Sequence, residues 1–180
     1  MMTKSILFFF IAFIFCGHAD SQITKGNWLV GGNANFSLQQ EMLNQSNITG
    51  FSINAAPDIG YFIIDKFAAG AKTKLSYRFI KLNGPVDKST YLGFGPFLRY
   101  YFLSTSNRIN IFAESAYQYS VDFKGHSQND FNFSAGPVIY FNTSVGLEFA
   151  FTYDTFKGTI SGPANTFSFG IGFQIHLEKE

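Results

Sequence analysis

Strict alternation of apolar and polar residues is the feature that most constrains this chain. Residues 166–177 (TFSFGIGFQIHL) show it without interruption. The odd-numbered positions from Phe167 to Leu177 are all apolar, and the even-numbered positions between them are polar or glycine. Because successive side chains of a β-strand point to opposite faces, a period of two predicts a strand with one apolar and one polar face. The face that meets water decides what kind of protein this is.

The same alternation recurs along the rest of the chain, with no convincing helical period. The segments are residues 28–38, 51–63, 67–79, 92–102, 109–121, 131–141, 145–153 and 166–177. They predict an all-β fold of eight strands, each of about ten residues or a little more, the length of a tilted membrane-spanning strand. An even number of such strands favours an antiparallel up-and-down transmembrane β-barrel.

The first residues have the three-part layout of a secretory signal peptide. One positive charge in Met1–Lys4 precedes the apolar run Ile6–Phe15, and a short polar stretch with small residues follows. We expect cleavage after Ser21, with cleavage after Ala19 as the alternative. The predicted domains are therefore a signal peptide over residues 1–21 and a barrel over residues 22–180. The single cysteine would leave with the signal peptide, so no disulfide is expected.

The connections between the predicted strands alternate in length. Short connections are expected around residues 64–66, 103–108 and 142–143, and longer polar ones at residues 39–50, 80–89, 122–130 and 154–164. Short turns on one side and long loops on the other are typical of outer-membrane barrels, with both termini on the short-turn side. The sequence therefore predicts that loops 39–50 and 154–164 are exposed at the cell surface.

Three observations indicate that the apolar face meets lipid. The apolar positions carry no charge in any of the eight segments, and only 14% of all residues are charged, against about 25% in soluble domains. Glycines crowd the polar positions, as a narrow lumen requires. Aromatic residues gather at the ends of the apolar faces, where interfacial girdles belong. Pro57 and Pro96 also lie on this face and are expected at bulges or strand ends. A soluble lipocalin-like carrier, with the same alternation turned inside out, is the alternative.

At this point the chain resembles a known family. The segments NWLVGGNANFSL, PDIGYFI, FAAGAKTKLSYRF, GFGPFLRYYF and FSFGIGFQIHL are similar to those of small eight-stranded outer-membrane β-barrel proteins of Gram-negative bacteria, the outer membrane protein beta-barrel domain family. The resemblance implies export, insertion by the barrel-assembly machinery and residence in the cell outer membrane among its lipids. It implies no reaction.

Residues able to carry chemistry are few, and no catalytic, cofactor or metal site is predicted. After cleavage the chain keeps only His126, in a polar loop, and His176, expected in the lumen. The lipid-facing positions include Ser115 but no histidine, which disfavours a lipid-modifying enzyme, the second hypothesis. A net charge of +1 gives no reason to expect nucleic acid. We expect a monomer with a structural, adhesive or surface-interaction role. A small-solute channel is disfavoured, because eight strands leave room only for side chains.

Charged residues on the lumen-facing positions form the one candidate cluster. All of them except Lys74 lie about four to six residues into their strands, counted from the short-turn side. Unpaired charges in a narrow lumen are costly to desolvate, so we expect a belt of ion pairs. In it Lys72 and Arg99 neutralise the three carboxylates, with Lys74 as a further cation and Arg99 as the hub. The predicted belt comprises Asp58, Lys72, Lys74, Arg99, Glu114 and Glu148.

Overall fold

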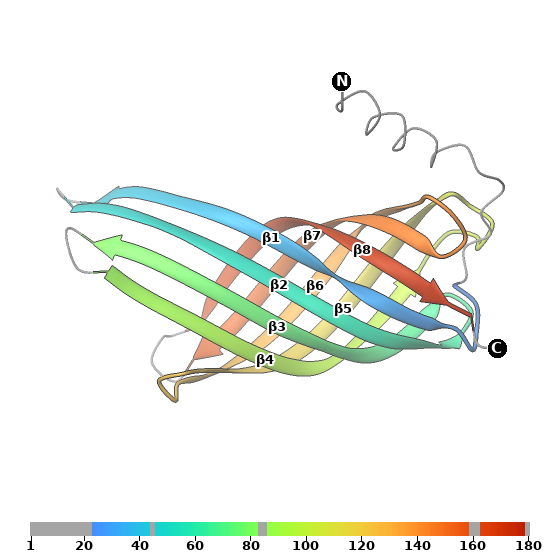
Figure 1. Ribbon diagram of the computed structural model, residues 1–180, viewed down its shortest axis with the longest axis horizontal. Helices are drawn as coiled ribbons and strands as arrows, with labels where there is room; N and C mark the ends of the chain where they lie inside the picture. The colour runs from blue at the N-terminus through green and yellow to red at the C-terminus, as the bar shows by residue number, and fades with distance from the viewer. Residues whose placement is uncertain (1–22, 44–45, 83–85, 159–162, 179–180) are drawn as a thin grey trace, which may run out of the picture.

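The protein is a closed β-barrel of eight antiparallel strands that follow one another in sequence order (Figure 1). The computed structural model describes residues 23–43, 46–82, 86–158 and 163–178; the predicted signal peptide lies outside them. The predicted all-β barrel is confirmed. The strands are β1 (Trp28–Leu43), β2 (Ser46–Ile64), β3 (Phe67–Leu82), β4 (Val86–Tyr101), β5 (Ile109–Asp122), β6 (Ser127–Tyr140), β7 (Val145–Gly158) and β8 (Ala164–Leu177).

The strands are longer than predicted, at 14 to 19 residues. Most of the expected long loops are therefore strand. Residues 39–43 and 46–50 continue the β1–β2 hairpin, and residues 154–158 continue β7. The remaining tips at residues 44–45, 83–85 and 159–162 lie outside the described residues. The β1–β2 and β3–β4 hairpins extend past the rest of the barrel (Figure 1).

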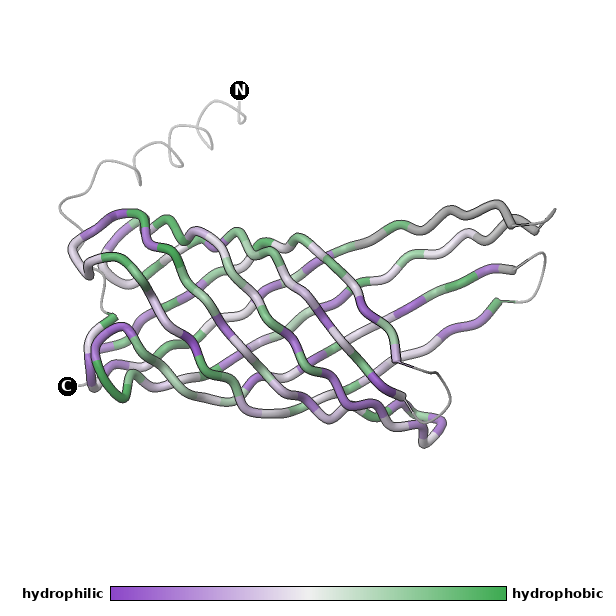
Figure 2. The backbone as a smooth tube through the Cα atoms, turned by 180° about the vertical axis from the view of Figure 1, so that it is seen from behind, coloured by the Kyte–Doolittle hydropathy of each residue, from purple (hydrophilic) through white to green (hydrophobic). Residues whose placement is uncertain are grey.

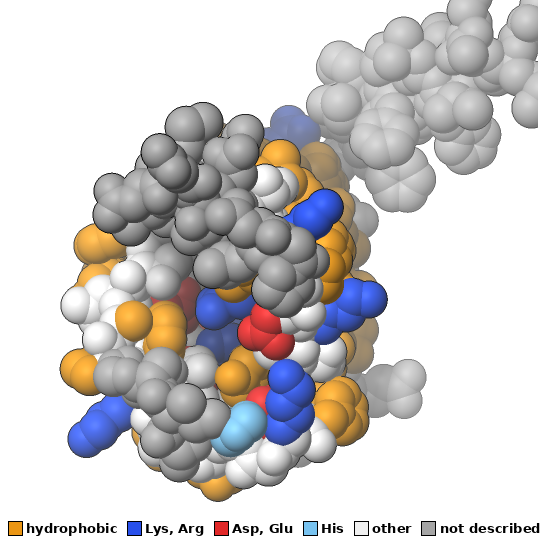
Figure 3. Space-filling model, turned by 90° about the vertical axis from the view of Figure 1, so that its left-hand side faces the viewer, with side chains coloured by type: hydrophobic (Ala, Val, Ile, Leu, Met, Phe, Trp, Pro, Cys, Tyr) orange, Lys and Arg blue, Asp and Glu red, His pale blue; other side chains and the backbone are white. Residues whose placement is uncertain are grey.

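The two ends of the barrel differ in how far the strands extend, whereas the predicted contrast of short and long connections is wrong, because most of the expected loop residues are strand. The short connections at residues 65–66, 102–108 and 141–144, together with the C-terminus, lie at one end, here called the turn end. The opposite end, with the extended hairpins, is called the hairpin end. Viewed onto the hairpin end, Lys and Arg side chains lie around the opening and within it (Figure 3).

The residues of one parity face outward and are mainly apolar, whereas those of the other parity face inward and, away from the turn end, are mainly polar or glycine. Figure 2 shows this alternation of hydropathy along the tube. Phe94, for example, is 63% exposed, whereas its neighbours on the polar positions are buried. Aromatic pairs stand near both ends of this face, such as Trp28–Tyr61 near the turn end and Tyr153–Phe167 toward the hairpin end. Such a surface is suited to lipid and not to water, which excludes the lipocalin-like alternative. None of the described residues forms a helix long and apolar enough to cross a membrane.

The two outward-facing prolines were predicted at bulges or strand ends, and this is wrong. Pro57 and Pro96 lie inside β2 and β4, in unshifted register. Each is paired on one side, Pro57 with Gly32 and Pro96 with Ala71, and lacks a ladder partner on the other. Since proline has no N–H to donate, one interrupted ladder is sufficient to accommodate it. At Pro57 the Thr73 hydroxyl donates to the proline carbonyl at 3.1 Å.

Closure between the first and last strands is partial. β1 pairs with β8 from Trp28↔Leu177 to Ala34↔Ile171. Beyond that point β1 continues alongside β2 and β8 continues alongside β7, but residues 35–43 and 164–170 are not paired with each other. The wall of the barrel therefore has a gap between β1 and β8, on the side of the hairpin end.

Candidate functional site: a plugged lumen, a charged belt and a polar cavity

The turn end of the lumen is filled by apolar and aromatic side chains. Phe62, Tyr101 and Tyr140 are fully buried, and their rings surround the imidazole of His176, with centroids 5.5 to 6.1 Å apart. Ile23, just before β1, is also fully buried, and its carbonyl accepts a hydrogen bond from the Lys66 amide at 2.8 Å. The N-terminal segment thus packs into the same plug.

Five of the six predicted charges meet directly next to this plug. Arg99 lies 2.6 Å from Glu114 and 2.5 Å from Glu148. Lys72 contacts both Glu114 and, at 3.3 Å, Asp58. Arg99 also lies 4.0 Å from Asp58. All five side chains are almost completely buried, so two cations and three carboxylates form one connected network with Arg99 at its centre.

Strand register explains why these residues meet. Asp58 and Lys72 are direct cross-strand partners on β2 and β3, and Arg99 and Glu114 on β4 and β5. Direct partners on one face have Cβ atoms about 5 Å apart, close enough for opposite charges to pair. Glu148 arrives from β7 across the lumen, where the amide of Gln174 also donates to it at 3.3 Å.

Small residues and aromatic faces make room for the network. A Cβ atom on Gly60 or Gly70 would lie within 3 Å of the Phe97 ring, so the two glycines hold space for this large side chain. Lys72 lies 5.5 Å from the Phe97 ring centroid, and the Arg99 guanidinium lies 4.7 Å from that of Phe112. Both rings attract the buried cations.

Lys74 is not part of this belt. Its ammonium lies 3.0 Å from Asp130 on β6, one step closer to the hairpin end. Asp130 is fully buried and also accepts hydrogen bonds from Ser120, at 2.8 Å, and from Gln128. Sequence reasoning placed Asp130 at the edge of a loop and so missed it, although it shares the parity of Asn132 and Ser134 on the predicted lumen face.

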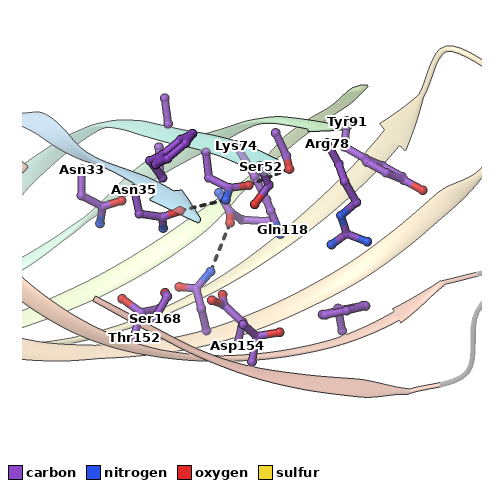
Figure 4. Close-up of a pocket in the computed structure, with 18 of the residues that line it drawn as sticks. Asn33, Asn35, Ser52, Lys74, Arg78, Tyr91, Gln118, Thr152, Asp154 and Ser168 are labelled. Atoms are coloured by element: carbon purple, nitrogen blue, oxygen red, sulfur yellow. Dashed lines mark hydrogen bonds between the residues drawn. The ribbon is translucent and has the colours of Figure 1, made fainter. Parts of the chain in front are cut away.

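Above the belt the lumen widens into a cavity of about 570 Å³. Lys72 belongs to its floor, and its walls are rich in amides and hydroxyls that converge from opposite sides (Figure 4). The lumen-facing lining residues include Asn33, Asn35, Ser52, Asn54, Lys74, Ser76, Arg78, Tyr91, Gln118, Asn132, Ser134, Thr152, Asp154 and Ser168. Of the residues that line this cavity, sequence reasoning singled out only Lys72 and Lys74 as site residues.

Neither of the two histidines that the structure describes lies in the cavity lining. His126 lies in the β5–β6 turn region, where its ring is 2.8 Å from Asp122, and His176 belongs to the plug. Within the described residues, no three His, Cys, Asp or Glu side chains gather in a way that would hold a metal ion.

Comparison with known proteins gives matches in structure alone. No family model and no curated protein matches the sequence. The outer membrane protein OprG from Pseudomonas aeruginosa superposes with a TM-score of 0.59 over 89% of this chain and 100% of its own, at 12% identity. Neisserial surface protein A (NspA) does so with a TM-score of 0.55 over 84% of this chain and 97% of its own, at 13% identity. The chain thus has the fold of a small integral outer-membrane β-barrel, as predicted.

Proposed function

We propose that this protein is a non-enzymatic barrel of the cell outer membrane that does not conduct solutes and acts at the cell surface through its hairpin end. The plug at the turn end carries the proposal. Leu29, Phe62, Tyr101 and Tyr140 are fully buried in the lumen, and the buried charges of the belt lie directly above them. A path for water and ions would have to displace both layers.

The extended hairpins are the part of the barrel that supports a role at the cell surface. A lipid-facing apolar band is about 25 Å tall, and a strand tilted by about 40° crosses it in roughly ten residues. The 19 residues of β2 exceed this length, so the β1–β2 hairpin projects beyond the membrane on the hairpin side. With the termini in the periplasm, this end faces the outside of the cell. We further propose a monomer that is inserted by the barrel-assembly machinery and surrounded by outer-membrane lipids.

A lipid-modifying enzyme is the less favoured reading. The cavity lining contains several serines, but the imidazoles of His126 and His176 are in the β5–β6 turn and the plug. Activation of a serine hydroxyl needs a base within hydrogen-bond reach. Asp154 is the carboxylate of the lining, and no described imidazole stands beside it.

Planar-bilayer recording of the refolded barrel tests the closed lumen. We expect no steady single-channel openings. As a matched comparison, Phe62→Ala with Tyr101→Ala removes two rings of the plug while leaving the outward face intact, and should raise the leak. Stable openings of the unmodified barrel would contradict the proposal.

A further inference from the structure

The gap between β1 and β8 connects the polar cavity with the lipid-facing surface. Among the residues that line the cavity are Phe36 on β1 and Phe167 and Phe169 on β8, whose side chains face outward and are 59%, 82% and 50% exposed. The lining also includes outward-facing residues of the paired β2–β3 wall, namely Phe51, Ala55 and Phe79. The opening is therefore marked by the interrupted β1–β8 ladder, beside which the phenylalanines of β1 and β8 and the inward-facing Asn35 and Ser168 line one cavity.

The gap opens within the apolar band. Pairing of β1 and β8 ends at Ala34, six residues along β1 from Trp28 in the aromatic girdle of the turn end. At about 3.4 Å per residue and a tilt of about 40°, this point lies roughly 16 Å above the girdle. The band is about 25 Å tall, so the gap begins in the leaflet nearest the hairpin end.

The cavity itself is polar and contains a guanidinium that is not neutralised by an ion pair. Its charged lining residues are Lys72, Lys74, Arg78 and Asp154. Lys72 and Lys74 are ion-paired, whereas Arg78 makes no ion pair with any residue that the structure describes. In the same cavity the buried Ser168 hydroxyl has no hydrogen-bond partner among the described residues. A guanidinium and a hydroxyl of this kind are donors suited to a phosphate.

We propose that the cavity binds an anionic amphiphile, with its phosphate-bearing headgroup at Arg78 and its hydrocarbon chain leaving through the β1–β8 gap into the membrane. A ligand that fills this space must have both a polar and an apolar part, because amides and hydroxyls line the chamber and exposed phenylalanines line its side entrance. The volume of about 570 Å³ lies in the range of small-molecule sites. The outer-leaflet location rests on the proposed orientation of the barrel, whereas the binding itself does not.

Photolabelling in detergent tests this without reference to the cell. The refolded barrel in dodecyl maltoside micelles is exposed to dodecyl phosphate carrying a diazirine in its chain, and the adducts are mapped by mass spectrometry. Labelling should concentrate on Phe36, Phe167 and Phe169. Two cross-strand partners on the opposite wall, Phe94 and Tyr119, are also aromatic and about as exposed, and should be labelled far less. The same chain on a maltoside headgroup should label both walls alike.

A pair of variants separates the cavity from general surface charge. Arg78→Ala should weaken saturable labelling about tenfold, the contribution of a charge-assisted hydrogen bond. Lys81→Ala removes an exposed outward-facing cation three residues along β3 and should leave labelling unchanged. A heat-modifiability gel confirms that both variants fold.

Three results would overturn the proposal. The first is equal labelling of the two walls by the phosphate probe. The second is equal labelling of the Arg78→Ala and Lys81→Ala variants. The third is displacement of the probe by methyl phosphate as effectively as by unlabelled dodecyl phosphate, which would indicate a site for soluble phosphate without lateral entry. None of these results bears on conduction or surface exposure, so the two proposals fail separately.

Discussion

Substitution of Arg99 should reveal, through the loss of stability, which carboxylates of the belt depend on it. In the described residues, Glu114 and Asp58 each have Lys72 as a second cation, whereas Arg99 is the only cation paired with Glu148. Arg99→Ala therefore strands Glu148, which retains only the Gln174 amide at 3.3 Å. Because breaking a buried pair leaves an uncompensated charge, we expect the free energy of unfolding to fall by about 3–5 kcal/mol.

A second substitution should restore part of that loss. Glu148→Gln removes the stranded charge, so the double variant Arg99→Ala/Glu148→Gln should lose less than the two single variants summed. The corresponding cycle with Glu114→Gln should also be non-additive, but by less, because Lys72 still neutralises Glu114 after Arg99 is removed. Coupling between residues in one network is typically about 0.5–3 kcal/mol.

Urea unfolding in lipid vesicles measures these differences, with the fluorescence of Trp28, the single tryptophan, as the signal. Lys124→Ala serves as the control, since its pair with Asp87 is exposed and 3.5 Å long and should contribute little. Strictly additive losses in both cycles would refute the network. A larger coupling with Glu114 than with Glu148 would refute the assignment of Glu148 as the dependent partner.

Three further predictions follow from particular contacts. Gly136→Ala should destabilise the barrel by about 1–3 kcal/mol, because a Cβ atom there would lie 1.8 Å from the Phe149 carbonyl oxygen. Gly170→Ala should be tolerated, because the nearest atom to a Cβ there is 3.5 Å away. Urea unfolding curves of the two variants test this difference. Lys74→Met should cost less stability than Arg99→Ala in the same assay, since its side chain is 19% exposed and its partner Asp130 keeps two further donors. An epitope tag after Gly125 should bind antibody on intact cells and one after Ser106 only after permeabilisation; the reverse pattern would invert the topology.

The outward and inward faces could be predicted from sequence because the membrane and the lumen impose a sharp contrast on alternate residues. The strand ends could not, because that contrast disappears where a hairpin leaves the bilayer. Residues 39–41 (QQE), for example, contain no apolar residue that would show the alternation. A polar strand and a polar loop then look alike, and the extension of β1 and β2 was interpreted as loop.

The partners of the lumen-facing charges could be predicted only in part. Asp58 and Lys72 flank the short turn at residues 65–66, so their common level can be worked out by counting along the two strands. Lys74 lies two residues further on, beyond the floor of the cavity, and its partner Asp130 is on β6. Asp130 was missed because the start of β6 was interpreted as loop, so no lumen-facing carboxylate was expected at that level.

The gap between β1 and β8 is the clearest case of a feature that depends on closure. Neighbouring strands elsewhere are joined by a hairpin, which fixes their register and brings both strands to similar lengths. β1 and β8 come from opposite ends of the chain, so only pairing itself holds them together. Their ladder ends at Ala34↔Ile171, where β1 stays with β2 and β8 with β7. In hydrocarbon, unpaired backbone groups are costly, and a fully lipid-exposed edge would not persist. A cavity lined by amides, hydroxyls and Arg78 is the environment in which such an edge is tolerated, which links the position of the gap to the polar chamber behind it.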